Sequence, residues 1–67
     1  MPRKVEYVRY RVVCMPPGGL NHILYAETLA EAGEFFRAHR GTPRTIEASR
    51  VPGGSESPWD VLRHAKR

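Results

Sequence analysis

Residues 28–41, T-L-A-E-A-G-E-F-F-R-A-H-R-G, predict the main helix of the fold. Thr28 and Glu31 form a capping box, in which the threonine oxygen accepts a backbone N–H and the glutamate reaches back. Apolar and ring side chains recur at the spacing of one helical face: Leu29, Ala32, Phe35, Phe36 and His39. Gly41 stands where a left-handed cap is favoured, and Pro43 prevents the helix from continuing.

Gly33 is the residue inside this segment that opposes a helix. A glycine there destabilises a helix by up to about 1 kcal/mol relative to alanine. We interpret its small size as room for a strand that passes close by.

Two strands are predicted before this helix. Residues 4–15, K-V-E-Y-V-R-Y-R-V-V-C-M, are rich in β-branched and aromatic types and contain no glycine or proline, which is typical of a strand. Pro17 followed by Gly18 predicts a type II turn. Residues 20–27, most clearly 22–26, then complete a β-hairpin.

Alternation along these strands indicates their faces. In the first strand, one face is expected to join the core and holds Val8, Tyr10, Val12 and Cys14. In the second strand, alternation leaves both faces open as the buried one, Ile23 and Tyr25 or His22, Leu24 and Ala26.

Two further elements are predicted after the main helix. Residues 44–51, R-T-I-E-A-S-R-V, alternate like a third strand, and residues 52–56 form a Pro/Gly-rich connector. Ser57 as N-cap and Pro58 as first helical residue then indicate a short second helix. Three side chains recur there at helical spacing: Trp59, Leu62 and Ala65.

The predicted fold class is therefore α+β in the order β-β-α-β-α. A small three-stranded sheet has the main helix on one face and the short C-terminal helix elsewhere. The domain organisation is a ββαβ core over residues 1–54 and a C-terminal helix over residues 55–67, docked on the core or bound to a partner.

Size, composition and charge limit the classes of protein. The chain has 67 residues with 40% hydrophobic and 27% charged content, which fits one small globular domain. No apolar run approaches the roughly 20 residues of a membrane span, and the single cysteine, Cys14, cannot form an internal disulfide. We therefore expect a cytoplasmic protein with no membrane partner. The net charge of +4 adds nucleic acid to the candidate partners.

The sequence lacks the patterns of common active sites. The three histidines and Cys14 show none of the paired spacings that zinc sites use. Cys14 and the serines have no base beside them, and the Gly-Gly pairs lack phosphate-loop spacing. We therefore predict no catalytic residues, no metal, no cofactor, no small-molecule substrate and no enzyme activity.

The favoured hypothesis is binding of another protein or of a second copy of this chain. Trp59, Val61 and Leu62 form an apolar patch on the predicted C-terminal segment, which is tethered by prolines and glycines. The pattern T-L-A-E-A-x-x-F after a hairpin is similar to that of small phage-type and mobile-element proteins. The predicted class is an accessory or regulatory factor, such as an adaptor, an inhibitor or a subunit.

The alternative hypothesis is nucleic-acid binding on the sheet. Tyr7, Arg9 and Arg11 alternate on the second face of the first strand, with Tyr25 and either Arg44 or Arg50 expected nearby. Aromatic stacking combined with arginine charge is how sheets hold single strands. A structural explanation competes with it, because a glutamate of the neighbouring strand, Glu47, would pair with Arg9 or Arg11 across the strands.

Overall fold

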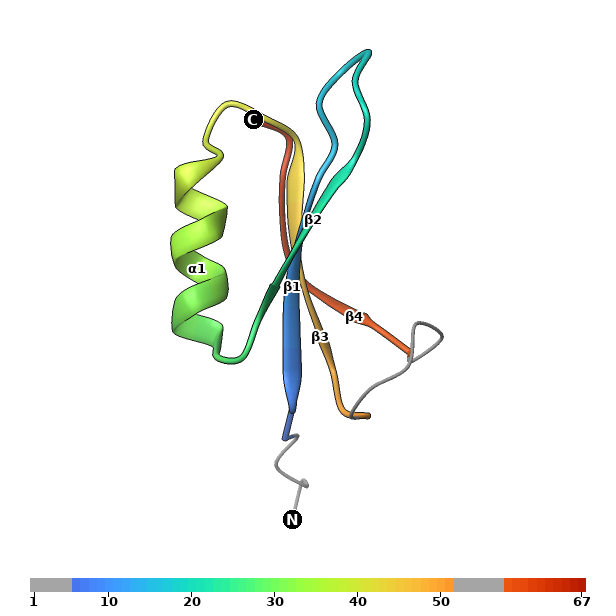
Figure 1. Cartoon of the computed structure of the whole chain (residues 1–67), viewed down its shortest axis with the longest axis vertical. Coiled ribbons are helices and arrows are strands. Elements are labelled where there is room, and N and C mark those ends of the chain that lie inside the picture. The colour runs from blue at the N-terminus through green and yellow to red at the C-terminus, as the bar shows by residue number, and fades with distance from the viewer. Residues whose placement is uncertain (1–5, 52–57) are drawn as a thin grey trace.

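The computed structural model describes residues 6–51 and 58–67. These residues form one helix and four strands, in the order β1 (Arg9–Cys14), β2 (His22–Ala26), α1 (Leu29–Ala38), β3 (Arg44–Ser49) and β4 (Asp60–Ala65). The strands make one antiparallel sheet in the order β2-β1-β3-β4. Helix α1 packs along one face of this sheet (Figure 1). The protein is a two-layer α+β fold.

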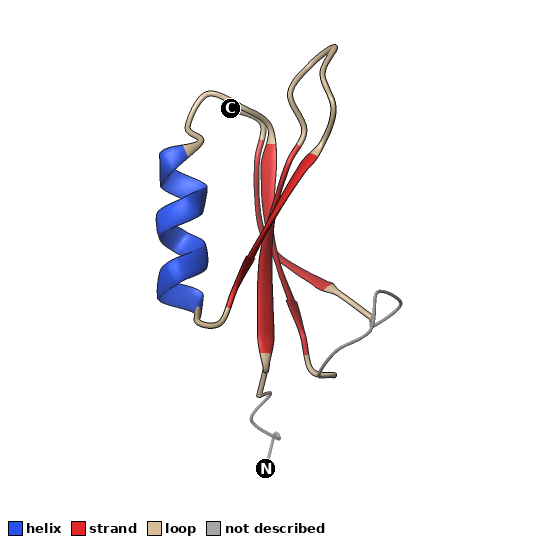
Figure 2. Ribbon diagram, viewed as in Figure 1, coloured by secondary structure: helices blue, strands red, loops and turns tan. Residues whose placement is uncertain are grey.

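The prediction of three strands and two helices was wrong at the C-terminal end of the chain. Asp60 begins β4, which pairs with β3 and extends the sheet to four strands (Figure 2). Pairing with β4 satisfies the backbone groups along the outer edge of β3, which a helix of about ten residues could not do. Ser57, the connector at 52–56 and the domain boundary between residues 54 and 55 lie outside the described residues.

The predicted start of the main helix is confirmed in detail. Thr28 is the N-cap, and its hydroxyl accepts from the backbone N–H of Glu31 at 3.1 Å. The Glu31 carboxylate accepts in return from the backbone N–H of Glu27, also at 3.1 Å. The helix ends at Ala38, and Gly41 has the positive φ, 100°, that its position predicted.

The predicted type II turn between β1 and β2 is also present. The backbone N–H of Gly19 donates to the carbonyl of Pro16 at 3.1 Å, and Gly18 has a φ of 71°. A positive φ at the third turn position is what the type II geometry requires. The two strands on either side of this turn pair in a register that places Val12 opposite Leu24.

The core lies between the sheet and α1. Its buried members come from α1 and from the first three strands: Val12, Cys14, Ala26, Ala32, Phe36 and Ile46. Ala26 and Leu24 point toward the helix, so the open question about β2 is decided against Ile23 and Tyr25. Val8, predicted for the core, is instead 48% exposed, and Leu29, on the apolar face of the predicted helix, is 52% exposed.

Gly33 does not make room for a strand. An added Cβ at this position would meet only the Nη1 of Arg37, at 3.9 Å, which is an ordinary contact distance. The interpretation of Gly33 as a site of close approach was therefore wrong.

Candidate functional site: the open face of the sheet

The sheet face opposite α1 is the first candidate site. Within residues 6–51 and 58–67, no element packs on it (Figure 1). Alternation and strand register assign to this open face the following residues: Arg9, Arg11, Val13, Ile23, Tyr25, Thr45, Glu47, Ser49, Val61 and His64.

An aromatic–arginine cluster of Arg9, Arg11, Tyr25 and Trp59 lies on the open face. The Arg11 guanidinium is 4.2 Å from the centroid of the Trp59 ring. The Arg9 guanidinium lies 5.5 Å from the ring centroids of both Tyr25 and Trp59. These distances are within the range of cation–π attraction.

Trp59 joins segments that are far apart in the sheet. It directly precedes β4, and β3 separates β4 from β1. Its ring therefore extends across β3 to reach Arg11, and it approaches Tyr25 of β2 to a centroid distance of 6.3 Å. Among the described residues, its buried Nε1 has no hydrogen-bond acceptor.

An ion pair neutralises one of the two arginines. Arg11 Nε donates to Glu47 Oε1 at 2.7 Å, and Arg11 Nη2 lies 2.6 Å from the same oxygen. The second oxygen of Glu47 accepts from the Thr45 hydroxyl at 3.0 Å. The cross-strand pair considered for Glu47 is thus confirmed with Arg11. The described open face carries two arginines and one glutamate, so its net charge is low.

The exposed part of the open face is its rim of edge strands. Ile23 and Tyr25 on β2 are 46% and 56% exposed, and Val61 on β4 is 60% exposed. Arg11 and Glu47, on the two central strands, have side chains only 21% and 14% exposed. Solvent therefore meets apolar and aromatic side chains at the edges and a closed ion pair at the centre.

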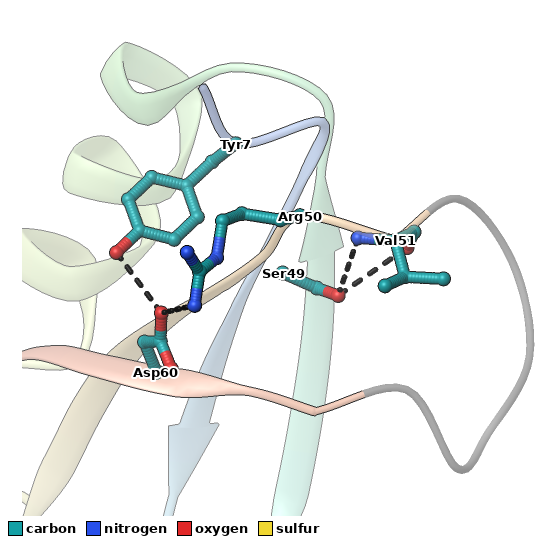
Figure 3. A network of polar contacts seen from close by, with 5 residues as sticks. All are labelled: Tyr7, Ser49, Arg50, Val51 and Asp60. Carbon is teal, nitrogen blue, oxygen red and sulfur yellow. Dashed lines mark hydrogen bonds and ion pairs between the residues drawn. The ribbon is translucent and has the colours of Figure 1, made fainter. Parts of the chain in front are cut away.

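The structure brings together only some of the residues of the two binding hypotheses. Trp59 and Val61 lie on the open face, while the β3–β4 register skips Leu62 at an irregularity. Figure 3 shows that Tyr7 and Arg50 contact Asp60: the Tyr7 hydroxyl is 3.1 Å, and the Arg50 Nη2 3.7 Å, from Asp60 Oδ2.

The side chains of Tyr7 and Arg50 are thus engaged at the end of the sheet. In the same region, the Ser49 hydroxyl holds Val51, accepting from its N–H at 3.1 Å and donating to its carbonyl at 3.3 Å (Figure 3). Lost solvation and the hydrogen bond to Asp60 raise the pKa of the Tyr7 phenol above its ordinary value. Arg9, Arg11 and Tyr25 are therefore the members of the nucleic-acid set that share one surface.

The described residues offer little for catalytic or metal chemistry. Residues 6–51 and 58–67 contain no group of three His, Cys, Asp or Glu side chains placed to hold a metal ion. The Cys14 thiol is buried beside the helix, and burial raises its pKa. A buried thiol with a raised pKa is a poor nucleophile.

Comparisons with known proteins add no assignment. No protein-family model matches the sequence, and no curated protein or solved structure is significantly similar to it. Helix α1, at ten residues, falls short of a membrane span, and no other helix occurs in the described ranges.

Proposed function

We propose that this protein is a small non-catalytic accessory factor that binds another protein, or a second copy of itself, through the open face. The observation that carries the proposal is the aromatic–arginine cluster on an uncovered sheet face. Tryptophan, tyrosine and arginine are the residues that most often dominate binding energy at protein interfaces. Tyr25 of this cluster is itself exposed, and two further exposed apolar side chains lie beside the cluster: Ile23 and Val61.

The charge of the open face favours a protein over nucleic acid. Phosphate contacts need cations that are free to approach the strand. Arg11 is instead held by Glu47 at 2.6 Å and by Trp59 at 4.2 Å, which leaves Arg9 as the cation without a carboxylate among the described residues of this face. Low charge with aromatic and aliphatic side chains is the composition of an interface core.

Capture of partners from the native host tests this proposal. We compare the wild type with Val61→Arg, which places a charge on the open face, and with Leu29→Arg, which makes the same change on α1. Both positions are more than half exposed, at 60% and 52%, so both variants are expected to fold. Extracts are treated with nuclease, and sedimentation velocity of the purified variants reports self-association.

The proposal predicts a complex that survives nuclease, is lost with Val61→Arg and is retained with Leu29→Arg. If the partner is a second copy of the chain, the wild type and Leu29→Arg sediment as an oligomer, while Val61→Arg sediments as a monomer. A complex that disappears with nuclease and is weakened by Arg9→Ala would instead support nucleic-acid binding on this face. Equal binding by both variants would remove the open face as the interface.

A further inference from the structure

A second site lies on the opposite side of the sheet, where four arginines surround one cleft. Arg37 comes from α1, Arg40 from the turn that follows it, Arg44 from the start of β3 and Arg63 from β4. All four line a cleft of about 500 Å³. The guanidinium groups of Arg44 and Arg63 lie 4.1 Å and 5.6 Å from the centroid of the Phe36 ring. Among residues 6–51 and 58–67, none of those that line this cleft is acidic.

Arg44 is the unusual member of this group. Only 5% of the residue is exposed, and its Nε and Nη1 donate to the carbonyls of Phe36, at 2.5 Å, and Thr42, at 3.0 Å. Both acceptors are neutral. Among the described residues the ion pairs join Arg11 to Glu47 and Arg50 to Asp60, so Arg44 has no carboxylate there. A buried charge is normally compensated by a partner of opposite charge.

The charges around the cleft are segregated along the molecule. Residues 35–45 and 62–67 contain six lysines and arginines and no acidic residue: Arg37, Arg40, Arg44, Arg63, Lys66 and Arg67. Three glutamates of this side lie earlier in the chain: Glu27, Glu31 and Glu34. The C-terminus lies close to the loop that follows α1 (Figure 1), so β4 brings its basic end to the same place.

Helix capping alone does not explain this arrangement. Cations near a helix C-terminus interact favourably with its carbonyl groups, and Arg44 makes such contacts. The exposed Arg37, Arg40 and Arg63 make no hydrogen bond to a carbonyl within the described part of the chain. The described lining of the cleft thus gathers positive charge that none of its own residues neutralises.

We infer that this cleft binds a phosphate group. The guanidinium fork matches phosphate oxygens in pairs of parallel hydrogen bonds, and arginine is favoured over lysine wherever such recognition occurs. A phosphate in the cleft supplies the opposite charge that Arg44 lacks, while Arg37, Arg40 and Arg63 contact it from the rim. The group belongs either to a small phosphorylated molecule or to the backbone of a nucleic acid. This site is independent of the open face and of its partner.

The test is an NMR titration of the full chain with two probes, inorganic phosphate and a short oligothymidylate, at constant ionic strength. The cleft variant is Arg40→Gln with Arg63→Gln. The control is Arg50→Glu, which lowers the net charge by the same two units away from the cleft and from the aromatic–arginine cluster. All three positions are exposed, and circular dichroism verifies the fold of both variants.

Saturable changes in NMR chemical shift are expected around residues 33–44 and 63–67. Binding is expected to be about tenfold or more weaker in the cleft variant, because two charge-assisted hydrogen bonds are lost. The control is expected to change by no more than about twofold. Binding of phosphate itself identifies a small phosphorylated ligand, and binding of the oligothymidylate alone identifies backbone phosphates. The inference is overturned if neither probe binds at the cleft, or if the two variants weaken binding equally.

Discussion

The two faces of this one sheet are stabilised by different physical means. On the helix side, Val12 and Ile46 are almost wholly buried and pack with Phe36 of α1. On the open face, the adjacent positions Arg11 and Glu47 are joined by an ion pair beneath the Trp59 ring. The helix side thus holds the fold together by apolar burial. The open face is closed at its centre by charge pairing and stacking, and its apolar side chains remain exposed at the rim.

Removal of Phe36 is expected to have the largest effect. Phe36 is 6% exposed and contacts the core from α1, so Phe36→Ala leaves a cavity and is expected to cost about 3–5 kcal/mol of unfolding free energy. That is comparable with the total stability of about 5 kcal/mol expected for so small a domain. Circular dichroism at 25 °C should show a largely unfolded variant. A folded variant that loses less than about 1 kcal/mol would contradict the assignment of the core.

Removal of Glu47 is expected to have an intermediate effect. Glu47→Ala leaves the Arg11 charge, 21% exposed, without its carboxylate and also removes the acceptor of the Thr45 hydroxyl. We expect a loss of about 2 kcal/mol in urea unfolding, because a partly buried charge is left unpaired. Glu34→Ala, on the exposed face of α1, serves as the control and should change stability by less than about 0.5 kcal/mol. Similar values for the two variants would show that the centre of the open face is solvated.

A change on α1 is expected to stabilise the protein slightly. Gly33→Ala adds a Cβ that meets only Arg37 Nη1, at 3.9 Å. Alanine reduces the entropy of the unfolded chain and favours the helix, so we expect a gain of about 0.5–1 kcal/mol in urea unfolding. A loss of stability would mean that the backbone at Gly33 is more tightly enclosed than the structure shows.

A rise in pH is expected to have the smallest effect on the stability of the fold, because stability changes only at alkaline pH. Burial raises the pKa of Cys14, and burial with the Asp60 hydrogen bond raises the pKa of Tyr7. A raised pKa in the folded state means that both groups stabilise the fold fully below their ordinary values of 9.0 and 10.0. That contribution is lost as the pH rises through the folded pKa values. Thermal melts should show this decline, and Tyr7→Phe should reduce its upper part; a flat profile above these values would contradict it.

Much of the fold was predictable because its signals are local. The capping box at Thr28, the turn at Gly18 and the alternation of β1 each depend on a few neighbouring residues. The last strand was not predictable in this way. Trp59, Leu62 and Ala65 recur at helical spacing, and short segments of this kind fit either structure. The deciding partner, the free edge of β3, is more than ten residues away in the sequence.

The candidate site was predicted only in part, because some of its contacts follow from local patterns and others depend on distant segments. Alternation places Arg9 and Arg11 on one face, and the hairpin brings Tyr25 beside them. The position of Trp59 over Arg11 depends on the way β4 joins the sheet, so no local pattern indicates it. The arginine cleft likewise combines residues from three elements, and only the absence of acidic residues after position 34 in α1 and the following loop hinted at it.

The most direct test of the division between the two faces measures stability and binding on the same preparation. Tyr25→Ala combined with Val61→Ser removes exposed side chains from both edges of the open face. The account predicts an unfolding free energy within about 1 kcal/mol of the wild type, together with loss of the nuclease-resistant complex. A folded variant that binds like the wild type would contradict the assignment of the open face to binding. An unfolded variant would contradict the division of roles between the faces.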